Sequence, residues 1–447
     1  MGQIKILRVK GMKKRTKNWT LAIIVPLFAL LTFLYVDESL SPLSKELLEY
    51  KIVERLDNNG QVYLWCFACK TDDVYESAKN IQQKINQTDK SNYEEDIDWD
   101  EFDKYKFADN LLICNKFETD CNVFEIANNL TNDKLKLNYF WALARYQSYF
   151  EFDFYMSQTY PSEEEPLPNH RALINSQKTY HIWIIKNVLG KNQVEASNLL
   201  LEELNNLKKV LMKNDTLLPK LVVAEMIAEN LEFASQLIQK KLINPELFYM
   251  YKKELSLTKK HKDLTKALKR DYVIYLEMFS NIVSIKKTLK KKERLWLNSQ
   301  IVKVLYKFVY KPNNTINYLV DDIARILSLT KLPPKEFIKQ VNRKSTINKP
   351  NKVKNYLGNY YVKPHEINYY VDYIARVHSL HNKMILLKSL IKYGSIKSID
   401  GALSSKDFGF KNIFNDELPY FEDSLYCFNS IESKYVETKH KCLKVLD

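Results

Sequence analysis

Residues 311–329 read KPNNTINYLVDDIARILSL, and this stretch occurs twice in the chain. The second copy, KPHEINYYVDYIARVHSL at residues 363–380, has one residue fewer and 12 identical positions. In both copies a proline stands near the start, and apolar residues then recur at the three- and four-residue spacing of a helix with one buried face. The duplication therefore predicts two similar amphipathic helices, with Asn313 or Asn314 capping the first and His365 the second.

Each copy has an apolar face of four positions. These are Val320, Ile323, Ala324 and Leu327 in the first copy, and Val371, Ile374, Ala375 and His378 in the second. His378 takes the place of a leucine, and we interpret it as a core histidine whose hydrogen bonds are satisfied. A metal site is the weaker interpretation, because His381, one turn later, has no obvious third ligand beside it.

Arg325 and Arg376 occupy equivalent positions on the flank of these two faces. Arginine forms bidentate pairs with carboxylates, so the two side chains are candidate binding residues for an acidic segment of a partner, provided that they line one groove. An intramolecular pair with Asp321, Asp322 or Asp372 would satisfy either arginine equally well.

The rest of the chain also has the composition and pattern of a helical protein. Its 447 residues include only eight glycines, against a usual share of about 7 %, which leaves little of the turn chemistry that β-sandwiches and barrels need. Amphipathic runs recur, and residues 169–214 read as an antiparallel helix pair. Near the C-terminus, residues 425–430 and 434–446 read as two short strands. We therefore predict a mainly α fold: an N-terminal transmembrane helix, an irregular helical body of helix hairpins and a small C-terminal β-hairpin cap.

Residues 19–36, WTLAIIVPLFALLTFLYV, contain no charge and as a helix would span roughly 27 Å. Seven basic residues and no acid precede this run, and Asp37 follows it, so the positive-inside rule places the N-terminus in the cytoplasm and the body in the periplasm. A cleaved signal peptide is the alternative, but the run lacks a small-residue cleavage site. The sequence predicts a single-pass inner-membrane protein with the lipid bilayer as one partner.

These boundaries divide the chain into five predicted parts. They are a basic cytoplasmic tail at 1–18, the anchor at 19–36, an N-terminal helical subdomain with an acidic loop at 37–160, a helical body at 161–393 and the C-terminal cap at 394–447.

The positive charge does not indicate nucleic acid. The formal net charge is +14, but the first 18 residues account for half of it. Lysine greatly outnumbers arginine, whereas surfaces that read phosphates favour the bidentate fork of arginine. We therefore predict no nucleic-acid partner.

The six cysteines are Cys66, Cys69, Cys114, Cys121, Cys427 and Cys442. Outside the cytoplasm thiols are oxidised to disulfides, and spacing favours the pairs Cys114–Cys121 and Cys427–Cys442. Cys66 and Cys69 then either pair with each other or remain thiols. A zinc site of the first four cysteines is a weaker alternative, because the second pair lies too far apart for the usual spacing.

The stretch VYLWCFACK at residues 62–70 suggests the active site of a thioredoxin, with an apolar strand-like run before Cys66 and Cys69. A thioredoxin-like fold also needs alternating strands and helices and a cis-proline strand downstream. One helical segment follows instead, and then the acidic loop SNYEEDIDWDEFD, residues 91–103. A structural segment that contains two cysteines is the favoured interpretation.

Several of these stretches resemble an uncharacterised family of single-pass, membrane-anchored, mostly helical proteins of Gram-negative bacteria. They are the two copies of the duplicated helix, NNGQVYLWCFACKTDDVY and the spacing CNKFETDC. A small residue stands at the place of Cys66 in that pattern, which argues against a shared redox role. The resemblance implies an architecture and no activity.

No recognised phosphate loop, zinc-protease motif, nucleophile elbow or carboxylate pair is found in the sequence. No catalytic residue, metal ligand or cofactor is therefore predicted. The favoured function is a helical binding or scaffold module facing the periplasm, with an envelope protein as its partner. The alternative is an envelope thiol–disulfide oxidoreductase that uses Cys66 and Cys69.

Overall fold

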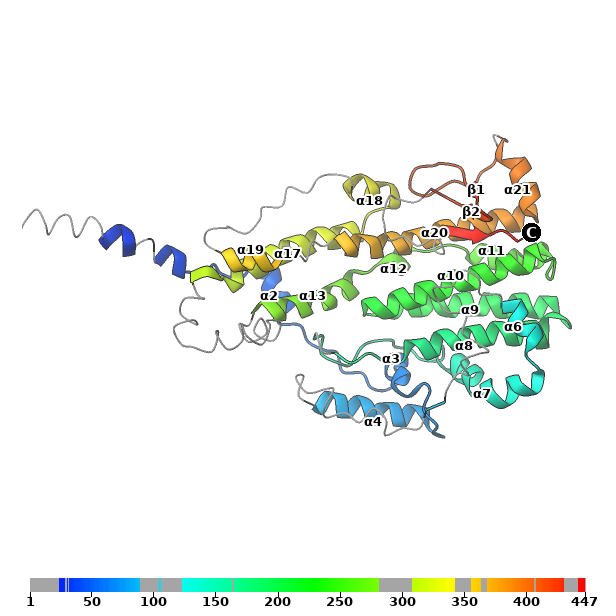
Figure 1. The fold of residues 1–447 in the computed structure, drawn as a ribbon, viewed down its shortest axis with the longest axis horizontal. Coiled ribbons are helices and arrows are strands. Elements are labelled where there is room, and N and C mark those ends of the chain that lie inside the picture. Colours follow the sequence, from blue (N-terminus) through cyan, green and yellow to red (C-terminus); the bar gives the residue numbers. More distant parts are fainter. Residues whose placement is uncertain are drawn as a thin grey trace, which may run out of the picture. The chain divides into compact units, whose positions relative to one another are not determined.

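The structure is a computed structural model of the 447-residue chain. It describes residues 24–28, 30, 32–88, 104–105, 123–162, 165–280, 308–341, 355–362, 368–405, 407–429 and 441–446. Most of these residues lie in helices, and the C-terminal region carries a small antiparallel sheet, so the predicted fold class is confirmed at this level (Figure 1).

The chain forms two compact units, each built from distant segments. Unit 1 combines Met1–Glu49, Tyr275–Ala324 and Ser345–Ile367. Unit 2 combines Tyr50–Ile274, Arg325–Lys344 and Asn368–Asp447.

Unit 2 contains most of the helices. In chain order they are α3 (Gly60–Tyr63), η1 (Leu64–Cys66), α4 (Val74–Gln87), α6 (Val123–Asn129), α7 (Asn132–Ser148), α8 (His170–Trp183), η2 (Ile184–Leu189), α9 (Gln193–Lys213), α10 (Leu217–Gln239), η3 (Pro245–Phe248), α11 (Tyr249–Glu254), α12 (Lys259–Lys262), α18 (Pro334–Val341), α20 (Asn368–Tyr393) and α21 (Ile396–Leu403). Unit 1 contains α2 (Pro42–Leu48) and α19 (Tyr356–Val362). Helices α13 (Thr265–Ser280) and α17 (Pro312–Leu329) contribute residues to both units.

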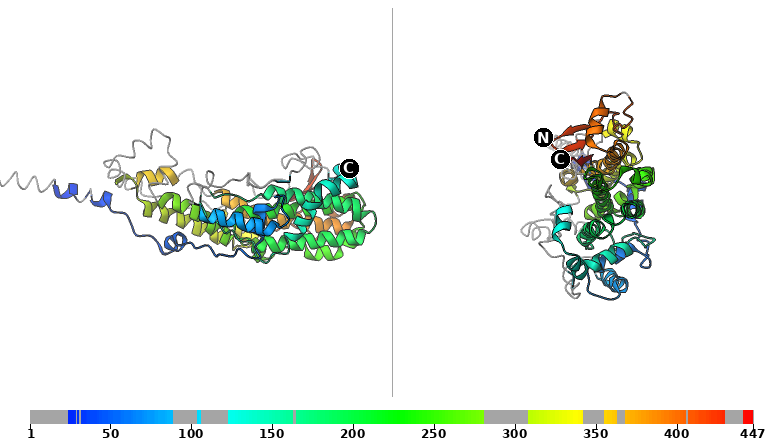
Figure 2. Two further views of the ribbon diagram at one scale, coloured as in Figure 1. Left: turned by 90° about the horizontal axis from the view of Figure 1, so that it is seen from below. Right: turned by 90° about the vertical axis from the view of Figure 1, so that its right-hand side faces the viewer.

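The core of unit 2 forms around α10, which packs against α8, α9 and α20. Helices α8, α9 and α10 lie side by side in both Figure 1 and Figure 2. Side chains such as Leu204, Leu207 and Ile227 are fully buried between them. The predicted helix pair is present, because α8 continues through η2 to Leu189 and α9 starts at Gln193 after the Asn192 cap.

The first copy of the duplicated helix is α17. Val320, Ile323 and Leu327 are buried as predicted, but Ala324 is exposed, so that part of the prediction is wrong. Ile316, Leu319 and Ile326 join the buried face, which is therefore centred further from Ala324 than the sequence pattern indicated.

The second copy begins α20, which is buried around most of its circumference. Its four predicted face positions, Val371, Ile374, Ala375 and His378, are all buried. The flanking Asp372 is buried as well, so the second copy is a central helix of unit 2 rather than a surface helix with one apolar face.

The start of α17 is capped from another part of unit 1. The helix begins at Pro312, so Asn313 and Asn314 lie in its first turn and the prediction that one of them caps it is wrong. Their backbone N–H groups donate instead to the two carboxylate oxygens of Asp37, at 2.8 and 3.2 Å. The carboxylate suits the positive end of the helix dipole. His365 lies outside the described residues.

Further contacts hold residues 35–44 against α17 in unit 1. The ammonium of Lys311 donates to the carbonyl of Tyr35 at 2.9 Å. The side-chain amide of Asn317 donates to Glu38 Oε1 and to the carbonyl of Ser39, both at 2.8 Å. The segment that directly follows the apolar run is thus fixed to the duplicated helix.

Three strands form the C-terminal sheet in the order β1 (Tyr420–Glu422), β2 (Leu425–Cys427) and β3 (Cys442–Lys444). The strands β2 and β3 lie within the two predicted strands and are shorter than predicted. They pair antiparallel, with Cys427 opposite Cys442. A disulfide joins these two cysteines. The strand β1 was not predicted, and it forms a hairpin with β2.

In the described part of the apolar run, residues 24–28, 30 and 32–35 are helical, and their large apolar side chains are exposed except for the half-buried Leu34. No helix among the described residues is both long and apolar enough to cross a membrane. The basic tail 1–18, residues 19–23, the acidic loop 91–103 and the pair Cys114 and Cys121 lie outside the described residues.

Candidate functional site

The residues before Cys66 form the short helices α3 and η1, and Cys69 follows after a turn, so the strand of the thioredoxin interpretation is not found and the segment is a packed structural one, as favoured. Asn59 caps α3 by accepting from the Gln61 N–H at 3.0 Å, and its amide donates to the carbonyls of Arg55 and Met156, both at 2.8 Å. Gly60 is required here, because a Cβ atom would clash with the ring of Tyr155. The helical form is therefore imposed by contacts with residues far along the chain.

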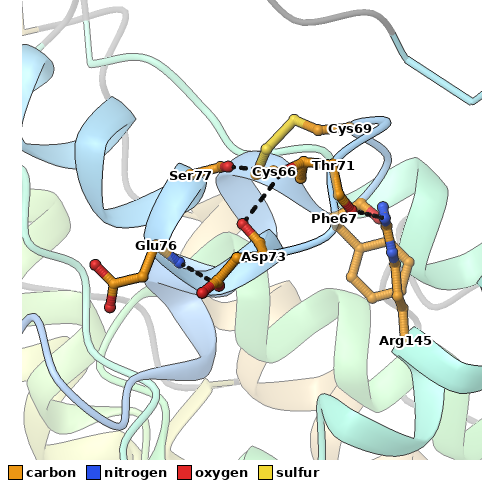
Figure 3. The surroundings of a disulfide bond; sticks show 8 residues. All are labelled: Cys66, Phe67, Cys69, Thr71, Asp73, Glu76, Ser77 and Arg145. Atoms are coloured by element: carbon orange, nitrogen blue, oxygen red, sulfur yellow. Dashed lines mark hydrogen bonds between the residues drawn. A yellow bond between two sulfur atoms is a disulfide. The ribbon is translucent and has the colours of Figure 1, made fainter.

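Cys66 and Cys69 form a disulfide in the last turn of this segment, with their Cα atoms 5.0 Å apart. Cys66 is fully buried and Cys69 is 2 % exposed. The bridge packs in a small apolar core with Val62 and with Ala78 and Ile81 of α4. Figure 3 shows the bridge between the η1 turn and the start of α4.

Arg145 of α7 holds the chain around the disulfide (Figure 3). Its Nη1 donates to the carbonyl of Phe67 at 2.8 Å, and its Nη2 donates to the carbonyl of Thr71 at 3.4 Å. The guanidinium lies 5.2 Å from the ring centroid of Tyr105, which stacks on Trp141. Burial lowers the pKa of Arg145, but an arginine stays charged at neutral pH. Arg145 thus fixes the loop around the disulfide at the carbonyls of Phe67 and Thr71.

An open pocket of about 440 Å³ lies beside the disulfide in unit 2. It is lined by Trp65, Ala68, Cys69, Lys104, Leu167, Pro168, Asn169, His170 and Arg171. Ala68, Cys69, Pro168 and His170 are buried, whereas Lys104, Leu167 and Arg171 are exposed at the edge. None of these nine lining residues is acidic. The pocket therefore combines a buried floor, which is apolar except for His170, with a positively charged edge.

Two backbone features position the charged edge. The Asn169 side chain accepts from the Ala172 N–H at 3.1 Å and starts α8, so Arg171 lies in the first turn, where the helix dipole adds positive potential. Lys104 is held beside Cys69 by a backbone bridge, and the N–H of Tyr105 donates to the carbonyl of Ala68 at 2.7 Å. The pocket can therefore take a ligand that carries a carboxylate next to an apolar or aromatic group, for which Trp65 and Leu167 provide the wall.

The two arginines predicted from the duplicated helix lie elsewhere in unit 2. Arg325 and Arg376 are partly exposed, and the guanidinium of Arg376 lies 5.5 Å from the ring centroid of Tyr373. Neither lines the pocket beside the disulfide. Their shared groove stays a prediction.

His378 is a core histidine, 2 % exposed and packed between the rings of Phe337 and Phe414. Neither of its ring nitrogens has a hydrogen-bond partner within the described part of the chain. The predicted hydrogen bonds of this histidine are therefore not found there. Burial lowers the pKa of His378 to about 3, and the histidine is therefore neutral.

Sequence reasoning missed a buried polar network on Glu203 of α9, a residue that lies between Leu200 and Leu204 on the buried face. Its Oε1 accepts from the hydroxyl of Tyr146 at 2.6 Å and from the Gln177 amide at 3.0 Å. Its Oε2 accepts from the Asn230 amide at 2.8 Å and lies 3.0 Å from His181 Nε2. An acid at an apolar position of a helix was the signal that could have identified it.

A second buried network, also missed, surrounds Arg270 of α13. Its Nη1 and Nη2 donate to the two oxygens of Glu165 at 2.9 and 2.6 Å, and Nη2 also donates to the carbonyl of Thr159 at 2.8 Å. Arg270 thereby fixes the connection between α7 and α8, which ends at the pocket. The pattern around Arg270 in the sequence gave no sign of this role.

No family model, no curated protein and no solved structure matches this chain. The resemblance noted in the sequence is therefore a proposal.

Proposed function

We propose that the chain is a membrane-anchored, helical binding module of the cell envelope, and that its pocket beside the Cys66–Cys69 disulfide receives an acidic segment of an envelope protein. The observation that carries this proposal is the composition of the pocket. Lys104 and Arg171 are exposed at its edge, no lining residue is acidic, and Trp65 and Leu167 add apolar surface. Charge-assisted contacts with a carboxylate are the strongest that such a pocket can offer.

The rigidity of the pocket also supports a binding role. Its floor is held by the disulfide, by Arg145 and by the buried Asn59 cap, so the pocket loses little conformational entropy when a ligand binds. A preformed pocket of this kind suits recognition.

Binding of a fluorescent peptide of six glutamates to the full chain tests the pocket. We expect the Arg171→Gln variant to bind at least about tenfold more weakly than the wild type, because a charge-assisted hydrogen bond is worth about 1.5–3 kcal/mol. The matched control is Lys397→Gln, another exposed cation of unit 2, which should bind like the wild type. Equal affinities for Arg171→Gln and the wild type would mean that the peptide does not use this pocket.

The anchor is proposed from residues 19–36 and their flanking charges, which orient the body toward the periplasm. The hydrogen bonds of residues 35–44 with α17 would then hold unit 1 next to the membrane. A periplasm-active reporter fused after residue 60 is expected to be active in cells, and a cytoplasm-only reporter at the same point silent. The reverse result would contradict this orientation.

A thiol–disulfide oxidoreductase is the second candidate, since the bridge is formed and Cys69 lines the pocket. The burial of Cys66 disfavours it, because exchange needs an accessible sulfur. Mixed disulfides trapped by a Cys69→Ser variant and absent from the wild type would favour this second function over the binding module.

A further inference from the structure

A cluster of basic side chains lies where α9, α11, α12 and α20 contact one another in unit 2. Lys262, the last residue of α12, donates from Nζ to Nδ1 of His381 on α20 at 2.9 Å. Lys388 lies seven residues beyond His381, which is close to two helical turns, so both side chains project from the same face of α20. Lys252 of α11 and Lys208 of α9 act electrostatically on Lys388.

The cluster carries more positive than negative charge. Lys208 is paired with Glu254, since its Nζ lies 2.9 Å from Oε2. Neither Lys262 nor Lys388 forms an ion pair with a carboxylate of the described residues. Burial lowers the pKa of Lys262 to about 8, and burial together with Lys252 and Lys208 lowers that of Lys388. An anion at this place would relieve the repulsion among the lysines.

The hydrogen bond with Lys262 also fixes the tautomer of His381. Burial, and then the charges of Lys262 and Lys388, lower the pKa of His381 to about 3, so its ring is neutral near pH 7. Because Nδ1 accepts from Lys262, the single ring proton lies on Nε2. The partly exposed His381 is therefore a hydrogen-bond donor through Nε2.

We propose that Lys262, His381 and Lys388 form a binding site for a phosphate group, carried by free phosphate or by an anionic lipid headgroup. The Lys262 ammonium has two N–H groups left after its bond to His381, and His381 Nε2 and the Lys388 ammonium provide further donors. These are the donor types that bind the oxygens of a phosphate. The site is separate from the pocket beside the disulfide and does not depend on its function.

Titration of the full chain with inorganic phosphate, followed by ¹⁵N signals of labelled histidines, tests the site. We expect the Nε2 signal of His381 to shift and saturate. In Lys262→Gln and in Lys388→Gln the dissociation constant should rise about tenfold, because each variant removes one charged donor. The matched control, Lys335→Gln, removes an exposed lysine paired with Asp416 and should leave the affinity unchanged.

The phosphate titration of the wild type shows by itself whether a site exists, even if a variant folds poorly. Absence of any phosphate-dependent shift at His381, or equal affinities in Lys262→Gln and Lys335→Gln, would overturn the proposal. Vesicles of phosphatidylglycerol distinguish the two sources of the phosphate group. Vesicle binding that requires Lys262 would identify a lipid headgroup, and saturation by inorganic phosphate without such vesicle binding would identify a soluble phosphate.

Discussion

Replacing Glu203 with alanine is expected to lower the free energy of unfolding by about 3–5 kcal/mol, the usual cost of breaking a buried, paired charge. The change would leave the hydroxyl of Tyr146, the amides of Gln177 and Asn230 and the ring of His181 without their shared acceptor. These donors come from α7, α8 and α10, so the loss would weaken the centre of unit 2. Urea unfolding monitored by circular dichroism measures the effect.

The neighbouring Glu202 provides the matched control, because it lies on the same helix and is exposed. Glu202→Ala should change the free energy of unfolding by less than about 0.5 kcal/mol. An equally small effect for Glu203→Ala would show that the network contributes nothing to stability.

The contribution of Glu203 should also depend on pH. Burial alone would raise the pKa of this carboxyl, but the charge of His181 and the hydrogen bonds from His181, Tyr146 and Asn230 outweigh burial and hold the pKa below its usual value. A lowered folded-state pKa stabilises the fold above the unfolded pKa of about 4.3, and this stabilisation is lost as the pH falls through the folded pKa. The difference between wild type and Glu203→Ala should therefore shrink below about pH 4.

Replacing Arg270 with methionine is the second change for which we expect a cost of about 3–5 kcal/mol. The arginine is 5 % exposed and forms a bidentate pair with Glu165, which would lose the one cation that contacts it among the described residues. The same arginine holds the Thr159 carbonyl, so residues 157–165 would lose their attachment to α13. Thermal and urea unfolding measure the loss.

A double-mutant cycle separates the pair from general damage to the fold. The variant Arg270→Met with Glu165→Gln should lose clearly less stability than the sum of the two single variants, because it leaves no unpaired charge. Lys266→Met is the control, since Lys266 is exposed on the same helix. Strict additivity of the two changes would contradict the interpretation of Arg270 and Glu165 as a coupled pair.

The helices could be predicted from the sequence because their period is a local property. The repeated apolar positions predicted the helices α17 and α20 and most of their buried residues. The exposed Ala324 shows that the position of the buried face around a helix also depends on the elements that pack against it. The β2–β3 pairing was likewise foreseeable from two short apolar runs that each carry a cysteine.

The pocket could be predicted only in part. Of its lining residues, Trp65 and Cys69 stand out in the sequence, but periodicity does not distinguish a strand from a helix in a short apolar run. Asn59 favours the helix here, because its side-chain amide donates to the carbonyls of Arg55 and of the distant Met156. The cations of the pocket edge come from other segments, and no local pattern brings Lys104 and Arg171 together.

Photocrosslinking in intact cells tests the binding module most directly. A photoreactive amino acid replaces Leu167, which is 62 % exposed at the edge of the pocket, or Val194, which is 51 % exposed elsewhere in unit 2. We expect a discrete crosslinked protein from position 167, none from position 194, and loss of the product when Arg171→Gln is added. The same products from both positions, or a product from position 167 that survives Arg171→Gln, would contradict it.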